Sequence, residues 1–246
     1  MRWIAALLLC GMLSSMPVSA AGGIGYGQGT AVDGNNCPTG ALDFDAQYGK
    51  YGAYATTPDR SRIILTFDQG YENGYTAKIL DVLKKTKTPA AFFVTGPYVK
   101  NEPELIKRMV EEGHIVGNHT VNHPSMTDVG NEELTKEPSD LNDIFFKLTN
   151  SNMTYMRPPK GEFSERTLAL TQKNGYKSVF WSVAYADWDT NNQKGVNYAV
   201  EQVTKQFHNG AIILLHAVSV DNANALEQII NIAKEQGYVF KSLEDL

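Results

Sequence analysis

The chain has 246 residues, of which 42% are hydrophobic and 20% are charged, a balance that is typical of a globular protein and excludes a wholly disordered one. Its net charge is -5 at pH 7 and it contains no block of Lys or Arg, which disfavours a nucleic-acid partner. The length is enough for a substantial core in one large domain or two small ones.

The N-terminus has the features of a secretory signal peptide. Met1-Arg2 provides a positive start, residues 3–13 form an apolar run shorter than a membrane span of about 20 residues, and small residues precede Ala20. We predict cleavage after Ala20; the alternative is an uncleaved N-terminal anchor. Cleavage would leave Cys37 as the only cysteine, so no internal disulfide could form, and its Gly/Asn-rich surroundings indicate an incidental thiol.

Residues 22–60 are rich in Gly, Asn, Ala, Asp and Tyr and show no helical period. We therefore predict an irregular N-terminal arm that packs on the rest of the protein. The expected organisation is a signal peptide over residues 1–20, the arm over 21–60, and a single catalytic domain over 61–246.

Strand and helix signals alternate from residue 62 onwards. Short apolar runs predict strands, at residues 62–67, 89–94, 115–117, 155–156, 178–183, 211–215 and 238–240. Apolar residues at helical spacing predict helices, at residues 75–85, 102–112, 131–149, 164–173, 196–207 and 222–235, the third of them kinked or delayed by Pro138. Apolar strands joined by helices predict a parallel α/β sheet, and the pattern fits both a barrel and an open doubly wound sheet.

Polar clusters follow several of these strands, beginning with Asp68 at the end of the apolar run 63–67. The carboxyl ends of parallel strands meet at one edge of the sheet, where α/β enzymes hold their catalytic groups. A carboxylate beside a divalent cation stays ionised and can accept a proton from a metal-bound water. Asp68 is therefore a candidate general base, although a turn-forming aspartate is the simpler alternative.

His119 and His123 form the second cluster. Imidazoles four residues apart can bind one cation if the segment makes a turn, and Pro124 keeps His123 out of a helix. The segment lacks the glutamate of an HExxH zinc motif, because Thr120 follows the first histidine. Taken alone, such a pair is as often structural. Three of the five histidines, with His216 as the third, fall at predicted strand ends, which favours a shared site.

His216, which follows a buried apolar run, is a candidate general acid. A carboxylate would have to keep its imidazole protonated at neutral pH, and Asp187 is the best candidate for that role. Arg157, stiffened by Pro158-Pro159, could clamp Asp68 in place. The alternatives are a core histidine bonded to a backbone carbonyl and a surface arginine before a turn.

These clusters contain five motifs in order: Thr66-Phe67-Asp68-Gln69-Gly70, His119 to Pro124, Arg157 to Gly161, Asp187-Trp188 and Leu214-Leu215-His216. Through these motifs, residues 61–243 resemble the polysaccharide deacetylase family, the carbohydrate esterases with a NodB-homology domain. The resemblance implies a distorted (β/α) barrel of about seven strands. It also implies the metal-dependent removal of acetyl groups from an N-acetylated sugar.

The resemblance implies roles for the catalytic residues as well. Asp68 would be the base and His216 the acid. Arg157 would orient Asp68, and Asp187 would tune His216. The backbone N–H of Lys160 would help to bind the oxyanion that develops in the tetrahedral intermediate.

The metal and the substrate are assigned in the same way. His119, His123 and Gln69 would hold a divalent cation, expected to be Zn²⁺. Trp181 and Trp188 are each either a core residue or a platform for a sugar ring. The residues assigned to the substrate are Lys160, Pro159, Trp188 and Tyr71.

Two positions depart from the family pattern, and the first is Gln69. Most members carry a second aspartate there as a metal ligand, and a neutral amide oxygen should bind a divalent cation more weakly. Glu72 or water could replace the lost ligand. Gln69 with the following Tyr71-Glu72-Asn73-Gly74 is similar to a subgroup that deacetylates muramic acid in peptidoglycan, a step towards muramic δ-lactam in the spore cortex.

The second departure is Lys160, where many members have an aromatic residue. Its cation, or that of Arg166, would pair with the lactyl carboxylate of a muramic acid that has been stripped of its peptide. Neutral chitin oligomers lack this carboxylate, so the contact would discriminate between the two sugars.

The leading interpretation is a secreted, monomeric hydrolase that removes acetyl from N-acetylmuramic acid in peptidoglycan glycan strands, with no membrane insertion after signal cleavage. It would act outside the cytoplasm at the cell wall, and in the forespore or cortex compartment if the organism sporulates. One alternative is a deacetylase of chitin oligosaccharides or of N-acetylglucosamine. The other is a glycan-binding protein that lost catalysis through the change at Gln69; the retained Asp68, Arg157 and His216 argue against it.

Overall fold

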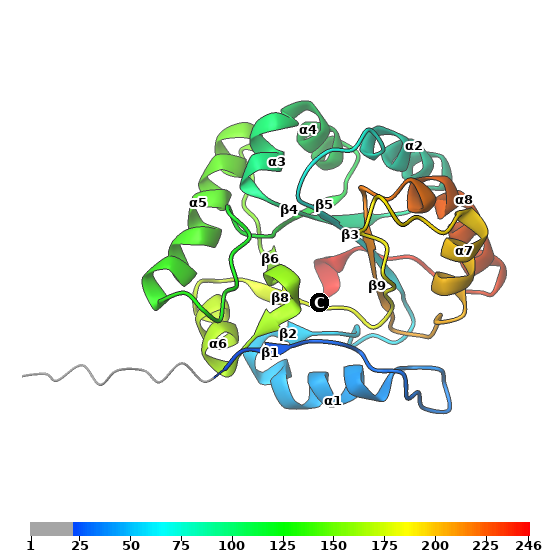
Figure 1. Ribbon diagram of the computed structural model, residues 1–246, viewed down its shortest axis with the longest axis horizontal. Helices are drawn as coiled ribbons and strands as arrows, with labels where there is room; N and C mark the ends of the chain where they lie inside the picture. The colour runs from blue at the N-terminus through cyan, green and yellow to red at the C-terminus, as the bar shows by residue number, and fades with distance from the viewer. Residues whose placement is uncertain (1–21) are drawn as a thin grey trace, which may run out of the picture.

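The computed structural model describes residues 22–246, so the predicted signal peptide and its cleavage site lie outside the described residues. The described chain folds around a curled sheet with helices on its outer side (Figure 1). None of the helices within residues 22–246 has both the length and the apolar character that crossing a membrane requires.

Every pair of neighbouring strands in the main sheet is parallel, as predicted. In spatial order the seven strands are β2 (Ala53–Tyr54), β8 (Lys177–Val179), β6 (Tyr155–Met156), β5 (Ile115–Asn118), β4 (Ala90–Val94), β3 (Ile64–Gln69) and β9 (Ile212–His216). A separate two-stranded sheet joins β1 (Ile24–Gly25) to β7 (Glu162–Phe163).

The main sheet curls into a distorted barrel, and isolated bridges link the segments near its two edges, β2 and β9. Thr56, which follows β2, forms an antiparallel bridge with Ala211, which precedes β9, and Val183, which follows β8, forms a parallel bridge with Ile213 on β9. These bridges draw the two edges together. The predicted barrel of about seven strands is therefore confirmed, and the open doubly wound sheet does not fit.

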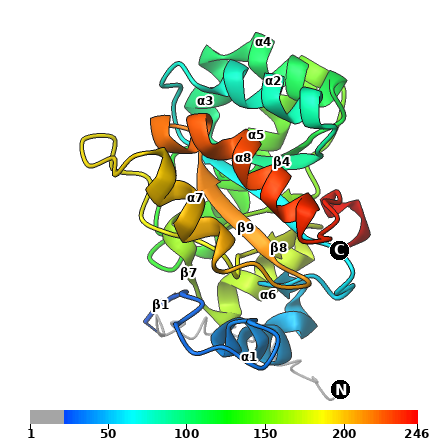
Figure 2. The same ribbon diagram turned by 90° about the vertical axis from the view of Figure 1, so that its right-hand side faces the viewer.

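Helices cover the outside of the sheet, and Figure 2 shows α7 and α8 lying over β9. They are α1 (Thr39–Tyr48), α2 (Thr76–Thr86), α3 (Gly96–Asn101), α4 (Pro103–Glu111), α5 (Asn131–Thr149), α6 (Glu165–Lys173), α7 (Val196–Thr204) and α8 (Val220–Glu235). The six predicted helices are all present within a few residues of their expected ends. Pro138 does not delay α5, which continues through it.

Alternation along β3 decides which residues reach the barrel interior. Successive strand residues point to opposite faces of a sheet. Leu65 and Phe67 belong to the main core, whereas Ile64 belongs to a smaller cluster that collects residues from several strands of the barrel. Thr66 and Asp68 share the face of Ile64, so both point into the barrel.

The N-terminal arm is more regular than predicted, and the expectation of an irregular segment over 21–60 was wrong for α1, β1 and β2. Helix α1 buries Ala41, Phe44 and Tyr48, whose spacings of three and four residues are helical. The signal is confined to a ten-residue segment and was missed. Strands of two residues, such as β1 and β2, carry no readable alternation; their pairing partners define them.

Three smaller differences concern other segments. Residues 238–240, predicted as a strand, form only one bridge, between Phe240 and Ile63. The strand predicted over 178–183 ends at Val179, because the chain then crosses to bridge β9. Helix α3 was not predicted, since its six residues are too few to show a period.

Candidate active site

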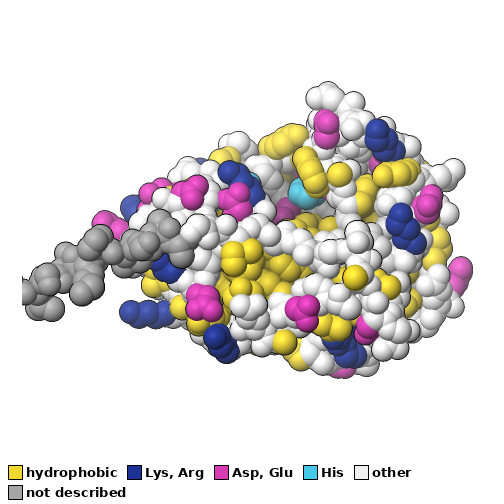
Figure 3. All heavy atoms as spheres, turned by 60° about the horizontal axis from the view of Figure 1, so that its bottom comes forward, with side chains coloured by type: hydrophobic (Ala, Val, Ile, Leu, Met, Phe, Trp, Pro, Cys, Tyr) yellow, Lys and Arg dark blue, Asp and Glu magenta, His cyan; other side chains and the backbone are white. Residues whose placement is uncertain are grey.

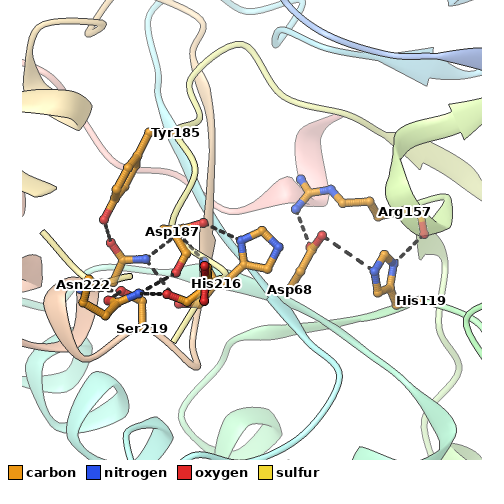
Figure 4. Close-up of polar contacts among 10 residues, drawn as sticks. Asp68, His119, Arg157, Tyr185, Asp187, His216, Ser219 and Asn222 are labelled. Atoms are coloured by element: carbon orange, nitrogen blue, oxygen red, sulfur yellow. Dashed lines mark hydrogen bonds and ion pairs between the residues drawn. The ribbon is translucent and has the colours of Figure 1, made fainter. Parts of the chain in front are cut away.

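The carboxyl ends of adjacent strands bring the predicted catalytic residues together (Figure 4). In the parallel register, Asp68 on β3 lies directly beside His216 on β9. On the other side of β3, the backbone N–H of His119 donates to the last carbonyl of β4 (3.0 Å), and that of Arg157 donates to the last carbonyl of β5 (2.9 Å). Four groups from distant parts of the sequence therefore stand in one row.

Three of these groups, Asp68, His119 and His216, line a cavity of about 680 Å³. The residues of its wall that were predicted from the sequence are Asp68, Tyr71, His119, His123, Lys160, Trp188 and His216. Trp181, expected to be either a core residue or a sugar platform, also lines the cavity, and the wall is completed by Tyr26, Gly70, Gly161, Leu214 and Val218. Figure 3 shows hydrophobic side chains gathered around a histidine on one face of the molecule, with acidic and basic side chains interspersed around them.

Arg157 holds Asp68 from inside the barrel. Its guanidinium is fully buried and donates to Asp68 Oδ1 (2.7 Å). Its other N–H groups donate to Thr66 Oγ1 (2.9 Å) and to the carbonyls of Val179 (2.9 Å) and Phe180 (3.1 Å). Burial alone would raise the pKa of Asp68, but the charge of Arg157 holds that pKa below its ordinary value. The carboxylate is therefore ionised at neutral pH.

Asp187 contacts His216 as Arg157 contacts Asp68, but with the charges reversed. The Nδ1–H of His216 donates to Asp187 Oδ1 (2.7 Å), and its backbone N–H donates to Oδ2 (2.8 Å). Burial alone would lower the pKa of His216, but the hydrogen bond and the charge of Asp187 raise it above its ordinary value. In Figure 4 the ring of His216 lies between Asp187 and Asp68, so its Nε2 is the nitrogen on the side of Asp68.

His119 and His123 lie side by side in the cavity wall, with their rings facing each other. Their Nε2 atoms are 3.2 Å apart, and that of His119 is 3.7 Å from Asp68 Oδ2. The Nδ1–H of His119 donates to the carbonyl of Arg157 (2.8 Å), which orients the ring and leaves Nε2 with a lone pair. Burial lowers the pKa of His119 to about 4 and also lowers that of His123, so both imidazoles are neutral at pH 7. His123 lies outside the helical region, as predicted, with a φ of 56°.

The other predicted ligand, Gln69, is buried and does not line the cavity. Its Nε2 donates to Thr76 Oγ1 (2.9 Å), while its Oε1 is buried without a hydrogen-bond partner. Glu72 accepts from the backbone N–H of Thr76 (3.2 Å) and from Tyr98 Oη (3.1 Å). Within residues 22–246, no three His, Cys, Asp or Glu side chains are grouped as a metal site. The imidazole pair is thus the best-defined part of the predicted ligand set.

Lys160 and Gly161 form the loop at one side of the cavity, and both have left-handed backbone conformations, with φ values of 58° and 67°. The Lys160 side chain is exposed at the cavity wall. Arg166, the alternative partner for a substrate carboxylate, donates instead to Asn131 Oδ1 (2.9 Å) and to the carbonyls of residues 126, 127 and 129. Its guanidinium is committed to that loop, so Lys160 is the better candidate of the two.

The residues assigned to the substrate fall into two groups. Trp188 and Tyr71 are 59% and 55% exposed, and both line the cavity, so their rings are available to a ligand. Trp181 is only partly buried and forms part of the wall. Pro159 is buried and does not line the cavity, which leaves it a role in shaping the loop.

The structure adds residues that reasoning from strand ends did not find. Asn222 on α8 donates to Asp187 Oδ2 (2.5 Å), and the hydroxyl of Tyr185 donates to Asn222 Oδ1. Asn222 follows His216 by six residues at the start of a predicted helix, a signal that could have identified it. Tyr26 reaches the cavity from the N-terminal arm, and no local pattern predicts that contact.

Comparisons with known proteins identify the relatives of this chain. A family model described as polysaccharide deacetylase matches residues 55–179. The chain is 45% identical to the peptidoglycan-N-acetylmuramic acid deacetylase PdaA of Bacillus subtilis, an alignment that covers all of this chain and 96% of that protein. The structure is similar to that of B. subtilis PdaA, a family 4 carbohydrate esterase, with a TM-score of 0.86 at 47% identity, covering 91% of this chain and 96% of that one.

The same fold also occurs in a protein described as a pseudoenzyme. A family 4 pseudoenzyme from Bacillus anthracis matches with a TM-score of 0.73 at 27% identity, covering 79% of this chain and 68% of that chain. Likeness in fold therefore does not by itself establish catalysis, which depends on the arrangement of the reacting groups.

Proposed function

The chain belongs to the polysaccharide deacetylase family, and we propose that it hydrolyses the N-acetyl group of N-acetylmuramic acid residues in the glycan strands of peptidoglycan. The observation that carries this proposal is the pairing of Asp68 with His216 at one cavity, in a chain 45% identical over its whole length to a peptidoglycan-N-acetylmuramic acid deacetylase. Chitin oligosaccharides and N-acetylglucosamine are less well supported as substrates.

Asp68 is the general base of the proposed reaction. Its lowered pKa keeps it ionised, so it can accept a proton from the water that attacks the amide carbonyl. Arg157 occupies Oδ1, whereas Oδ2 lies on the side of His119 and the cavity. The base is therefore held in one orientation before the substrate arrives.

His216 is the general acid. An amine is a poor leaving group unless its nitrogen is protonated, and Nε2 of His216 is placed to donate that proton. Asp187 stabilises the imidazolium through Nδ1. The negative charge that develops on the carbonyl oxygen would be met by the backbone N–H of Lys160 in the loop beside the cavity. Acetate and a free amino sugar are the products.

His119 and His123 fit a divalent cation, because two neutral imidazoles present Nε2 atoms to one another at 3.2 Å. Gln69 is buried and does not line the cavity, and its amide oxygen would be a weaker ligand than a carboxylate, so we expect loose binding, with Zn²⁺ the best match for an imidazole pair. A bound cation would polarise the attacking water and the amide carbonyl.

Specificity for muramic acid is assigned to Lys160. Its exposed ammonium group at the cavity wall can pair with the lactyl carboxylate, which N-acetylglucosamine lacks. Trp188 and Tyr71 offer exposed ring faces against which sugar rings can stack. The site thus combines aromatic platforms with one cation.

The proposed substrate determines where the enzyme works. Peptidoglycan lies outside the cytoplasmic membrane, so the enzyme acts there, delivered by the predicted signal peptide over residues 1–20. Deacetylation frees an amine on the sugar that carries the lactyl carboxylate, which makes the product a precursor of muramic δ-lactam. In an organism that sporulates, we propose that the enzyme acts in the forespore or cortex compartment.

The function is tested by mass spectrometry of glycan fragments after incubation with the enzyme. Peptide-free peptidoglycan strands and chitin oligomers serve as parallel substrates, each with and without added divalent ions. We expect acetyl loss from muramic residues, stimulated by the ions, and its reduction by about 10²- to 10⁴-fold in Asp68→Asn. Undiminished acetate release by that variant would refute the catalytic assignment.

The role of Lys160 is tested by the ratio of rates on the two substrates. A charge-assisted contact is worth about 1.5–3 kcal/mol, so Lys160→Ala should lose roughly tenfold to hundredfold on muramic strands and little on chitin oligomers. Lys160→Arg should retain most of the preference. Lys87, another lysine with a positive φ (53°), lies outside the cavity, and Lys87→Ala is the matched control. Equal losses on both substrates would contradict the charge argument.

A further inference from the structure

The N-terminal arm contacts the candidate oxyanion loop directly. Strand β1 pairs with β7, which begins immediately after the loop, and Gly25 lies opposite Glu162. The backbone N–H of Tyr26 donates to the carbonyl of Gly161 (2.9 Å). The match to the family model begins at residue 55, so this arm lies outside the part of the chain that the model covers.

The arm also holds Trp181, which packs against the same loop. The hydroxyl of Tyr26 donates to the carbonyl of Trp181 (2.5 Å), and Nε1–H of Trp181 donates to Gln28 Oε1 (3.0 Å). The rings of Tyr26 and Trp181 meet edge to face, with centroids 5.1 Å apart. A Cβ atom on Gly161 would lie only 2.7 Å from Trp181, so the indole is in direct contact with the loop backbone.

The loop needs support of this kind. Lys160 and Gly161 are consecutive left-handed residues, a conformation that a lysine keeps only where its surroundings hold it. An oxyanion donor is effective because it is oriented before the charge develops. A loop free to relax would lose that advantage while still closing one side of the cavity.

We propose that residues 24–28 are a positioning element that holds the backbone N–H of Lys160 in the orientation required for oxyanion stabilisation. The inference rests on the proposed function, since it assumes that an amide is hydrolysed at this cavity. Tyr26 and Gln28 act through Trp181 and Gly161. They are positioning residues, although the ring of Tyr26 also lines the cavity.

The backbone contact is isolated by comparing Tyr26→Ala with Tyr26→Pro, because both remove the phenol ring but only proline removes the N–H. Relative to Tyr26→Ala, we expect Tyr26→Pro to lower kcat about tenfold on muramic strands with KM unchanged within about twofold, since the lost contact serves the transition state. Tyr26→Phe keeps the ring and the N–H but loses the hydrogen bond to the carbonyl of Trp181, so it should lower kcat less than Tyr26→Pro does. Val32→Ala, an exposed change elsewhere in the arm, is the control.

A second substrate separates positioning from loss of structure. An N-trifluoroacetyl sugar forms an oxyanion that its own fluorines stabilise, so Tyr26→Pro should lose less on it than on the N-acetyl sugar. Equal losses on both substrates, or a rise in KM with kcat unchanged, would overturn the proposal and leave Tyr26 as a wall of the cavity.

A third measurement does not depend on activity. Amide hydrogen exchange of the peptide over residues 157–163 should be faster in Tyr26→Pro than in Tyr26→Ala. Identical exchange would overturn the positioning role even if the wild-type enzyme were active. If exchange were faster in Tyr26→Pro than in Tyr26→Ala but the wild-type enzyme released no acetate, the result would support the positioning role and count against the proposed function.

Discussion

The two halves of the cavity, around Asp68 and around His216, use the same arrangement with opposite charges. In the base half a carboxylate, Asp68, is proposed to react and a cation, Arg157, supports it. In the acid half an imidazole, His216, is proposed to react and a carboxylate, Asp187, supports it. Each supporting hydrogen bond is 2.7 Å long, and each supporting residue is buried. The opposite charge favours the ionised form in both halves, which lowers the pKa of Asp68 and raises that of His216.

The halves differ in the partners that the supporting residue keeps when the residue it supports loses its charge. Arg157 cannot lose its proton, so its fully buried charge always requires Asp68. Asp187 has other donors, because the backbone N–H of His216 and the amide of Asn222 also reach it. The side chain of His216 is also more exposed, at 24% against 10% for Asp68. Changes in the base half should therefore cost stability, and changes in the acid half should alter the pH dependence.

The largest effect is expected from Arg157→Ala, which leaves the carboxylate of Asp68 buried without its partner. The free energy of unfolding should fall by about 3–5 kcal/mol, measured by urea denaturation. Lys107→Ala, which breaks an exposed ion pair with Glu104, is the control and should change little. Combining Asp68→Asn with Arg157→Met should recover part of the loss. A loss below about 1 kcal/mol would contradict the structural role of this pair.

The next largest effect is expected from Asp187→Asn, measured as kcat against pH. The raised pKa of His216 keeps its imidazole protonated at neutral pH, so kcat should stay high as pH rises and should fall only when pH passes that pKa. Without the charge of Asp187 that pKa falls, so the alkaline limb should move to lower pH and kcat at neutral pH should fall about tenfold or more. Asp221→Asn is the control. Asp221 is also a buried carboxylate, on α8, but it accepts a hydrogen bond from the backbone N–H of Gly195 and not from His216. An alkaline limb that did not move would show that Asp187 does not set the pKa of His216.

The same pKa links stability to pH. Because the folded pKa of His216 is raised, its contribution to the free energy of unfolding is fully present below its unfolded value near 6.5 and is lost as pH rises through the folded value. Urea denaturation of the wild type, carried out below the unfolded pKa and above the folded pKa of His216, should show a lower free energy of unfolding at the higher pH. Asp187→Asn should show a weaker decline, and an equal decline in both proteins would assign it to another group.

The smallest effect is expected from Tyr185→Phe. The lost hydroxyl donates to Asn222, which still donates to Asp187, so the change reaches His216 only through two intervening groups. We expect kcat to fall by no more than about threefold, with a small shift of the alkaline limb in the direction seen for Asp187→Asn. Tyr198→Phe, on an exposed neighbour of Tyr185, should change neither quantity. A shift as large as that of Asp187→Asn would mean that the hydroxyl contributes directly.

Much of the candidate site could be predicted because its parts follow strands. A parallel sheet brings the carboxyl ends of its strands to one edge, so polar residues that end separate strands must meet there. Asp68, His119, Arg157 and His216 were placed together on this ground, and the predicted contacts of Arg157 with Asp68 and of Asp187 with His216 are present. Their catalytic roles stay predictions until the variants are measured.

Other parts could not be predicted because their sequence signals are too short or their contacts too distant. Strands β1 and β2 contain two residues each, fewer than one period of alternation needs. The contact between Tyr26 and Gly161 joins segments that no local pattern relates. The strand predicted at 238–240 failed for a similar reason, since an apolar run cannot show whether a neighbouring strand is free to pair with it.

By itself, the order of residues determined the class of fold and the chemistry available to it, because apolar periodicity and residue type are local properties. Only the packed chain decided which groups reach the cavity. In the folded chain Lys160 lines the cavity, whereas Arg166 is hydrogen-bonded to a neighbouring loop. Gln69 is buried outside the lining, and the N-terminal arm pairs with the strand that follows the candidate oxyanion loop. Those outcomes depend on which distant backbones lie next to one another, and that is settled by the geometry of the curled sheet.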